Sequence, residues 1–168
     1  DSPDRIEAMA IMADPDRDLI RGVLRNDEPV LMLDDPDGPV AISALPFGYE
    51  NAARECFGDT DIATPEDVIS AQIATARTQV PDGARWIVVV HAFVAGGESS
   101  ESEKALTRVG GIEYVSSQVF DGADYVALGH LHRPQKAGRD TIRYSGAPLA
   151  LGFDEGDAPK SMTLITMG

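Results

Sequence analysis

The stretch Arg-Trp-Ile-Val-Val-Val-His-Ala-Phe, residues 85–93, decides how the rest of the chain is interpreted. Its continuous apolar run of β-branched residues is typical of a strand buried on both faces, as in a sheet that other layers cover. The run stops at His91, where the strand is expected to give way to a loop. Residues 124–128 are predicted to form another buried strand, which ends in the same way at Gly129-His130-Leu131-His132. We therefore expect two buried strands with histidines at their carboxyl ends.

The remaining elements are expected on both sides of these strands. Thr64-Pro65-Glu66-Asp67 is a capping-box pattern and predicts a helix that runs to about Val80. Other predicted elements are helices near residues 3–12 and 17–25, strands at residues 30–33, 40–45, 141–145 and 161–166, and a loop over residues 46–61. A turn rich in Asp, Pro and Gly separates the first two strands and favours a hairpin. Helices alternating with strands, and then strands alone, predict an α/β fold in layers, with sheet packed on sheet.

Length and composition limit the class of protein. The chain has 168 residues, of which 43% are apolar, enough for one ordinary domain with a hydrophobic core. It carries 28 Asp and Glu against 14 Lys and Arg, a net charge of −14. Bulk charge therefore does not favour DNA or an anionic membrane, because these partners select basic surfaces. Any contact with a polyanion has to be local or to use bound cations.

The cysteine content and the hydropathy pattern favour a cytoplasmic protein without membrane association. The single cysteine, Cys56, cannot form a disulfide within the chain. No histidine lies near it in sequence, so it is interpreted as a small residue in or near a loop and not as a nucleophile. No apolar run approaches the roughly 18 residues of a membrane span.

All three histidines of the chain, His91, His130 and His132, lie where a predicted buried strand ends. Layered α/β folds form their sites at strand ends. Imidazole is a good ligand for zinc, manganese and iron, and residues i and i+2 of an extended segment project to the same side. The pattern predicts a shared metal site. It does not match a cupin, which would need a Glu where Lys136 and Ala137 stand, or an amidohydrolase barrel, since only 36 residues follow His132.

Other motifs indicate less chemistry. Gly96-Gly97 and Gly110-Gly111 lack the Gly-Lys-Ser/Thr ending of a phosphate-binding loop and are predicted to be turns. Gly58-Asp59-Thr60-Asp61 follows no buried strand, so a surface position is expected. Ser145-Gly146 lacks the flanking glycines of a nucleophile elbow.

Residues 89–97, 109–111, 124–135 and 142–149 contain the motifs that point to a family, and the run DYVALGHLHRPQ at residues 124–135 is highly specific. These motifs resemble the SbcD family of bacterial exonuclease subunits, which are calcineurin-like metallophosphoesterases related to the repair nucleases of archaea and eukaryotes. The resemblance implies a layered α-β-β-α sandwich. Residues 1–168 would be the C-terminal portion of that nuclease domain, and Asp1-Ser2-Pro3 would continue the family's Gly-Asn-His-Asp motif.

The resemblance also implies a site for two manganese ions. His91 would be the family's lone strand-end histidine and His130 the first of its final pair, both on one ion, while His132 would bind the other. Asp1 would be the acidic residue that orients the catalytic histidine. That histidine, the bridging aspartate and three further ligands are absent from this chain. We therefore expect the chain alone to bind manganese weakly and to cleave nothing.

For the intact protein, the resemblance implies manganese-dependent hydrolysis of DNA phosphodiesters, with duplex exonuclease and single-strand endonuclease activity, in recombination, repair and replication. The implied partners are DNA, the SMC-like ATPase subunit SbcC and a second copy of the intact subunit. Two alternatives stay open. An enzyme that acts on another phosphoester would share the histidines, and a non-catalytic remnant would keep the fold without the missing ligands.

Overall fold

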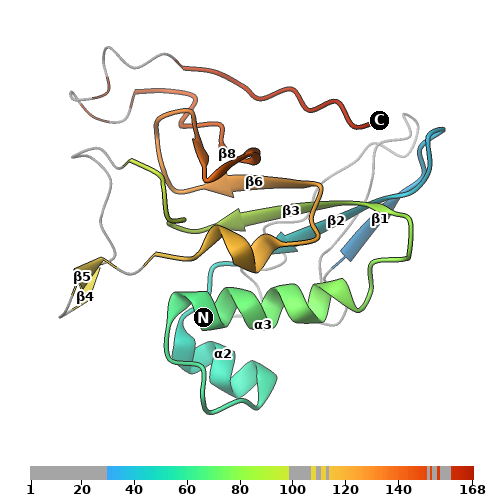
Figure 1. Ribbon diagram of the computed structural model, residues 1–168. Coiled ribbons are helices and arrows are strands. Elements are labelled where there is room, and N and C mark those ends of the chain that lie inside the picture. The colour runs from blue at the N-terminus through green and yellow to red at the C-terminus, as the bar shows by residue number, and fades with distance from the viewer. Residues whose placement is uncertain are drawn as a thin grey trace.

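The computed structural model describes residues 30–98, 107–108, 111–112, 114–150, 152, 155 and 160–168. The helices predicted near residues 3–12 and 17–25, and the candidate residue Asp1, lie outside the described residues. The elements are β1 (Val30–Leu33), β2 (Val40–Leu45), α2 (Glu50–Phe57), α3 (Pro65–Arg77), β3 (Arg85–His91), β4 (Thr107–Arg108), β5 (Gly111–Ile112), the 3₁₀ helix η2 (Ser117–Phe120), β6 (Tyr125–Gly129), β7 (Gln135–Ala137) and β8 (Arg139–Tyr144). The predicted α/β class is confirmed (Figure 1).

Six of the strands form one mixed sheet in the order β1-β2-β3-β6-β8-β7. The four central strands run parallel to one another, and β1 and β7 are antiparallel edge strands. Because β2, β3 and β6 run in the same direction, their carboxyl ends meet at one edge of the sheet (Figure 1). The predicted hairpin of β1 and β2 is confirmed with the predicted bounds.

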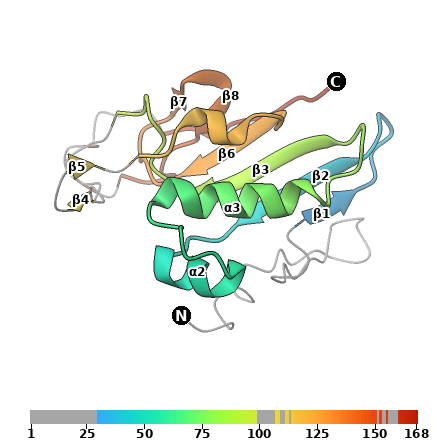
Figure 2. The same cartoon turned by 60° about the horizontal axis from the view of Figure 1, so that its bottom comes forward.

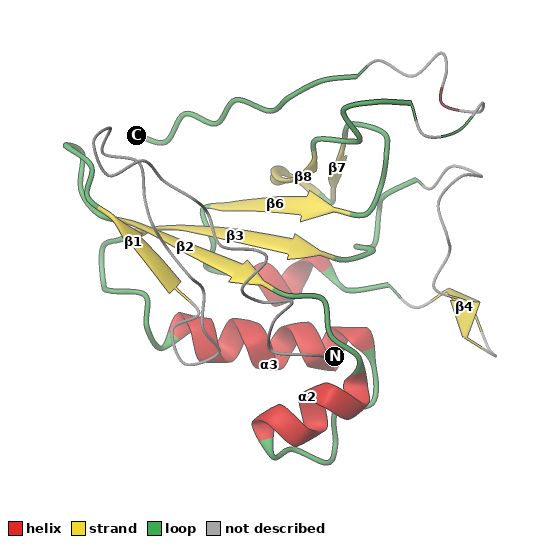
Figure 3. Ribbon diagram, turned by 180° about the vertical axis from the view of Figure 1, so that it is seen from behind, coloured by secondary structure: helices red, strands yellow, loops and turns green. Residues whose placement is uncertain are grey.

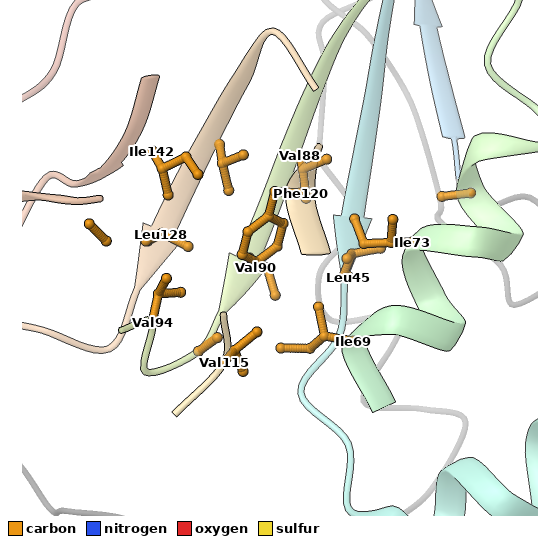
Figure 4. Packing of buried hydrophobic residues seen from close by; sticks show 14 of the residues in the cluster. Leu45, Ile69, Ile73, Val88, Val90, Val94, Val115, Phe120, Leu128 and Ile142 are labelled. Atoms are coloured by element: carbon orange, nitrogen blue, oxygen red, sulfur yellow. The ribbon is translucent and has the colours of Figure 1, made fainter. Parts of the chain in front are cut away.

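Helix α3 lies in the connection between the parallel strands β2 and β3, as such a crossover requires, and packs along the sheet (Figure 2). Figure 4 shows the apolar layer between them, in which Val88 and Val90 of β3 lie near Ile69 and Ile73 of α3, with Phe120 of η2 beside them. On the same face Trp86 is 1% exposed, and its indole N–H donates to Ser43 Oγ at 2.9 Å. The indole N–H and the serine hydroxyl thus have hydrogen-bond partners within the core.

The opposite face of β3 differs from the expectation. Trp86, Val88 and Val90 are buried, but Val89 between them is 39% exposed and His91 is exposed. Side chains alternate between the two faces of a strand, so only one face of β3 is well covered. The prediction that both faces are buried is wrong. The other ladder in the described ranges, β4–β5, has two residues in each strand, and sheet-on-sheet packing is not confirmed there.

The capping box at the start of α3 is confirmed. Thr64 Oγ1 accepts from the Asp67 amide at 3.1 Å, and Asp67 Oδ2 accepts from the Thr64 amide at 2.9 Å. The Ala63 amide donates to the same carboxylate oxygen at 3.0 Å. The helix ends at Arg77, three residues before the predicted end.

The loop predicted over residues 46–61 contains a helix, α2, and the prediction is wrong there. Its first residues have no side-chain cap, and the helix has few apolar residues, which is why its sequence resembles a loop. Packing forms it instead, because Ala53 contacts a small cluster with Ile62 and Val68 of the neighbouring segments. Cys56 lies exposed on this helix and not in a loop.

The strand predicted over residues 161–166 is not formed. Residues 160–168 run as an extended segment without helix or strand (Figure 3), and Met162 and Leu164 are 93% and 92% exposed. Its end is held by Arg85, whose guanidinium donates to the Met167 carbonyl at 3.1 Å. Strand β7, in contrast, was not predicted, because three residues are too short to give a period-2 pattern.

The weaker motifs agree with the predictions except at Gly111, which was predicted to lie in a turn and begins strand β5. Residues 58–61 are exposed, and Gly58 ends α2 in the left-handed conformation with φ of 66°. Gly96 lies in a turn with φ of 91°, whereas Gly110 is outside the described residues. None of the helices in the described part of the chain has the length and apolar character needed to cross a membrane.

Asp67→Asn is expected to reduce the acid sensitivity of the fold. Hydrogen bonds from the Ala63 amide and from Thr64 hold the pKa of the Asp67 carboxyl below its ordinary value. The resulting stabilisation is present above the unfolded pKa of about 3.9 and is lost as the pH falls through the lower folded value. The variant should lose up to about 1 kcal/mol at pH 7 and show a flatter pH dependence between about pH 4 and pH 2.

Urea unfolding measured at a series of pH values checks this prediction. Asp82→Asn, which alters an exposed carboxyl in the turn before β3, is the matched control. A wild-type pH dependence that persists unchanged in Asp67→Asn would contradict the role given to the capping box.

Candidate functional site

Strand register brings two of the predicted site residues together. His91, the last residue of β3, pairs with Gly129, the last residue of β6, and the Ala92 amide donates to the Gly129 carbonyl at 3.2 Å. His130 therefore follows directly beside His91. The His130 Nδ1 and His91 Nε2 atoms are 3.3 Å apart, and the ring centroids are 5.2 Å apart with planes at 84°.

The backbone around these two histidines is adapted to the contact. A Cβ atom at Gly129 would lie 3.2 Å from His91 Nδ1, so a glycine leaves room for the ring. His130 has a φ of 122°, and it is the one non-glycine residue with positive φ in the described ranges. Such a conformation costs about 1–3 kcal/mol and persists where the surrounding structure imposes it, which is often at functional sites.

The spacing of the two nitrogens suits a shared cation. Two imidazole nitrogens that bind one ion at about 2.1 Å, at angles between 90° and 109°, lie roughly 3.0–3.4 Å from each other. The observed 3.3 Å falls in that range. Within the part of the chain that is described, no group of three or more His, Cys, Asp or Glu side chains is arranged to hold a metal ion. The histidine pair alone would supply two of the ligands that such an ion needs.

Aromatic rings surround the pair on the apolar side. Phe47 lies edge-on to His91 at 6.0 Å between centroids, and Phe93 lies 5.8 Å from the His130 ring. A cleft between the end of β3 and the start of α3 adjoins them, and Val68 and Ile69 contribute to its wall. Burial lowers the pKa of His91, which favours the neutral imidazole, the form that binds a metal ion.

His132 has a different environment from the other two histidines. Strand β6 ends at Gly129, and residues 130–134 turn, so His130 and His132 do not lie on one extended segment as expected. The His132 Nδ1 atom lies 2.5 Å from Glu155 Oε1, and the second carboxylate oxygen, Oε2, accepts from Lys160 Nζ at 2.9 Å. The Glu155 side chain is fully buried, whereas His132 is 22% exposed.

Gly146 lies against the backbone of His132. It has a φ of 82°, and a Cβ atom there would lie 2.7 Å from the His132 carbonyl oxygen. The next residue, Ala147, donates its amide to the same oxygen at 3.0 Å. Ser145-Gly146 therefore serves a structural role in which the glycine permits close backbone approach.

The segment that follows His91 is held by a buried hydroxyl. Tyr144 on β8 is 0% exposed, its hydroxyl donates to the Ala92 carbonyl at 2.8 Å, and it accepts from the Val94 amide at 2.8 Å. These two bonds tie the carboxyl end of β3 to β8. The sequence offered no signal for this role beyond an aromatic residue at the end of a predicted strand.

Sequence reasoning also missed Glu155. It stands among Asp154, Gly156 and Asp157, a composition that indicates a solvated loop. No spacing pattern connects it with His132, which precedes it by 23 residues.

No protein-family model matches this chain. The family therefore remains a proposal.

Replacing His130 is expected to reveal the backbone strain. His130→Gly and His130→Ala both remove the ring, but glycine adopts a positive φ without steric cost. We expect His130→Gly to be more stable than His130→Ala by about 1 kcal/mol in chemical denaturation. The same pair of substitutions at Lys136, on β7, should give the opposite order by about 0.5–1 kcal/mol. Alanine at least as stable as glycine at position 130 would contradict the strain.

Tyr144→Phe is expected to lower the free energy of unfolding by about 1–3 kcal/mol, because the Ala92 carbonyl and the Val94 amide would lose this partner in the interior. Tyr114→Phe, at a ring that is 58% exposed, should change it by less than about 0.5 kcal/mol. Thermal or urea unfolding of the two variants checks the difference, and equal effects would argue against the bridging role.

Proposed function

We propose that the chain is the C-terminal portion of the nuclease domain of a calcineurin-like metallophosphoesterase of the SbcD family. The observation that carries the proposal is the contact of His91 with His130 at the carboxyl edge of a parallel sheet. The specific motif at residues 124–135, which contains His130 and His132, supports it independently. In the intact protein the activity is manganese-dependent hydrolysis of DNA phosphodiesters in recombination and repair, in the cytoplasm, with SbcC as ATPase partner and a homodimer as the assembly.

The three histidines have separable roles in this proposal. His91 Nε2 and His130 Nδ1 would hold one divalent cation, and His132 would hold the second. Bound divalent cations activate water and neutralise charge on the oxygens of a phosphoryl group. The chain contributes neutral nitrogen ligands, and burial of His91 favours that neutral form. Asp1, outside the described residues, would orient the catalytic histidine of the preceding motif.

The net charge of the chain is compatible with a DNA substrate if divalent cations occupy the site. A net charge of −14 repels phosphates in bulk. Cations held by uncharged imidazoles introduce positive charge at the site itself, where the scissile phosphate has to bind. The proposal therefore predicts that binding of the phosphodiester depends on the divalent cation.

The proposal is tested in the intact protein that contains this chain, with linear duplex and hairpin DNA as substrates. His91→Ala and His130→Ala should each reduce manganese-dependent cleavage by at least about 100-fold, because each removes a ligand to the ion that stabilises the transition state. Lys136→Ala is the control. Its ammonium pairs with Asp140 at 2.9 Å on the exposed sheet edge, and cleavage should change less than about twofold.

The substrate panel separates the alternatives. Removal of divalent cations with EDTA should abolish cleavage, and manganese should restore it. Preference for a small phosphodiester or a phosphoprotein over DNA would assign a different phosphoesterase activity. Failure of the folded intact protein to hydrolyse any of these substrates would contradict the proposal and favour a non-catalytic remnant.

A further inference from the structure

Glu155 is a fully buried carboxylate with two defined partners. Its Oε1 atom lies 2.5 Å from His132 Nδ1, and its Oε2 atom accepts from Lys160 Nζ at 2.9 Å. Its amide donates to the Gly152 carbonyl at 3.2 Å, which fixes the backbone at this point. Burying a carboxylate is costly unless its oxygens are paired, so the two contacts explain how an acidic residue is accommodated at 0% exposure.

The contact defines which nitrogen of His132 carries the proton. Glu155 Oε2 accepts from the Lys160 ammonium, and a carboxylate in such an ion pair accepts hydrogen bonds but donates none. His132 Nδ1 must therefore be the donor to Oε1. In a neutral imidazole with a proton on Nδ1, the lone pair that can bind a cation is on Nε2.

We propose that Glu155 is a positioning residue that, with Lys160, holds the His132 ring in the Nδ1–H form and orients its Nε2 toward a divalent cation. The inference rests on the proposed function for the identity of that cation. Carboxylates that accept from the second nitrogen of a histidine ligand fix its ring orientation and increase its basicity. His132 contacts the buried Glu155 carboxylate, and His91 and His130 contact one another.

The ring of His132 can be followed directly in the 168-residue chain. With ¹⁵N-labelled histidine, two-bond ¹H–¹⁵N spectra distinguish the Nδ1–H and Nε2–H forms, and the chain contains only three histidines. His132→Gln identifies the His132 signals by their loss. The wild type should show the proton of His132 on Nδ1, the nitrogen that contacts Glu155. A wild-type ring in the Nε2–H form would overturn the proposal without any variant.

Glu155→Gln is the variant that tests positioning. It keeps the shape of the side chain but removes the charge that selects the Nδ1–H form, so we expect a mixture of the two forms at His132. In a titration with manganese chloride, paramagnetic broadening of the His132 signals should require about 10–100 times more metal than in the wild type. Glu55→Gln, at an exposed position on α2, is the matched control and should leave both measurements unchanged.

The outcomes separate this inference from the proposed function. An unchanged His132 form and unchanged manganese titration in Glu155→Gln would overturn the positioning role, even if the intact wild type cleaves DNA. A fixed ring that is released in the variant, with weaker metal binding, supports the positioning role even if the intact wild type cleaves no DNA. No broadening of the wild-type His132 signals by manganese would overturn the orientation of Nε2 toward a cation.

Discussion

The pairing of His91 with Gly129 is the constraint on which the candidate site depends. A shift of one residue in the β3–β6 register would turn the side chains of one strand to the opposite face and separate the two histidine rings. It would also replace the glycine beside His91 with a residue that has a Cβ atom, where only 3.2 Å is available. The nitrogen-to-nitrogen distance is thus determined by the backbone pairing of two central strands.

That register is held at both ends of the strand pair. At the start of β6, the Asp124 carboxylate accepts from the Trp86 amide at 2.7 Å, and the Asp124 amide donates to the Trp86 carbonyl at 2.9 Å. At the other end, Ala92 bonds to Gly129 and also accepts from the Tyr144 hydroxyl. Between these ends Val88 and Val90 of β3 and Val126 of β6 are buried in the hydrophobic core. His91 and His130 therefore lie at the carboxyl end of a strand pair whose register is held at both ends.

The sequence predicted those features that depend on local patterns. Apolar runs identified β3 and β6, and Thr64 with Asp67 identified the start of α3, because these signals lie within a few neighbouring residues. The features that the sequence did not predict depend on packing partners that are distant in sequence. Helix α2 forms because Ala53 meets Ile62 and Val68, and the exposure of Val89 depends on which layers cover the sheet. The contact of Glu155 with His132 joins two segments that are distant in sequence, and no periodic sequence pattern indicates it.

The difference between local and distant sequence signals also applies within the candidate site, which has two halves, the His91–His130 pair and His132. The His91–His130 pair could be anticipated because His91 ends β3 and His130 directly follows β6, its neighbour in the parallel sheet. The environment of His132 could not, since it depends on a carboxylate supplied by a segment beyond the last strand of the sheet. One half thus consists of two facing imidazoles, and the other of an imidazole against a buried carboxylate. The Glu155 carboxylate, whose charge Lys160 partly offsets, lies against the His132 ring, so residues that no local sequence pattern connects with His132 determine its electrostatic environment.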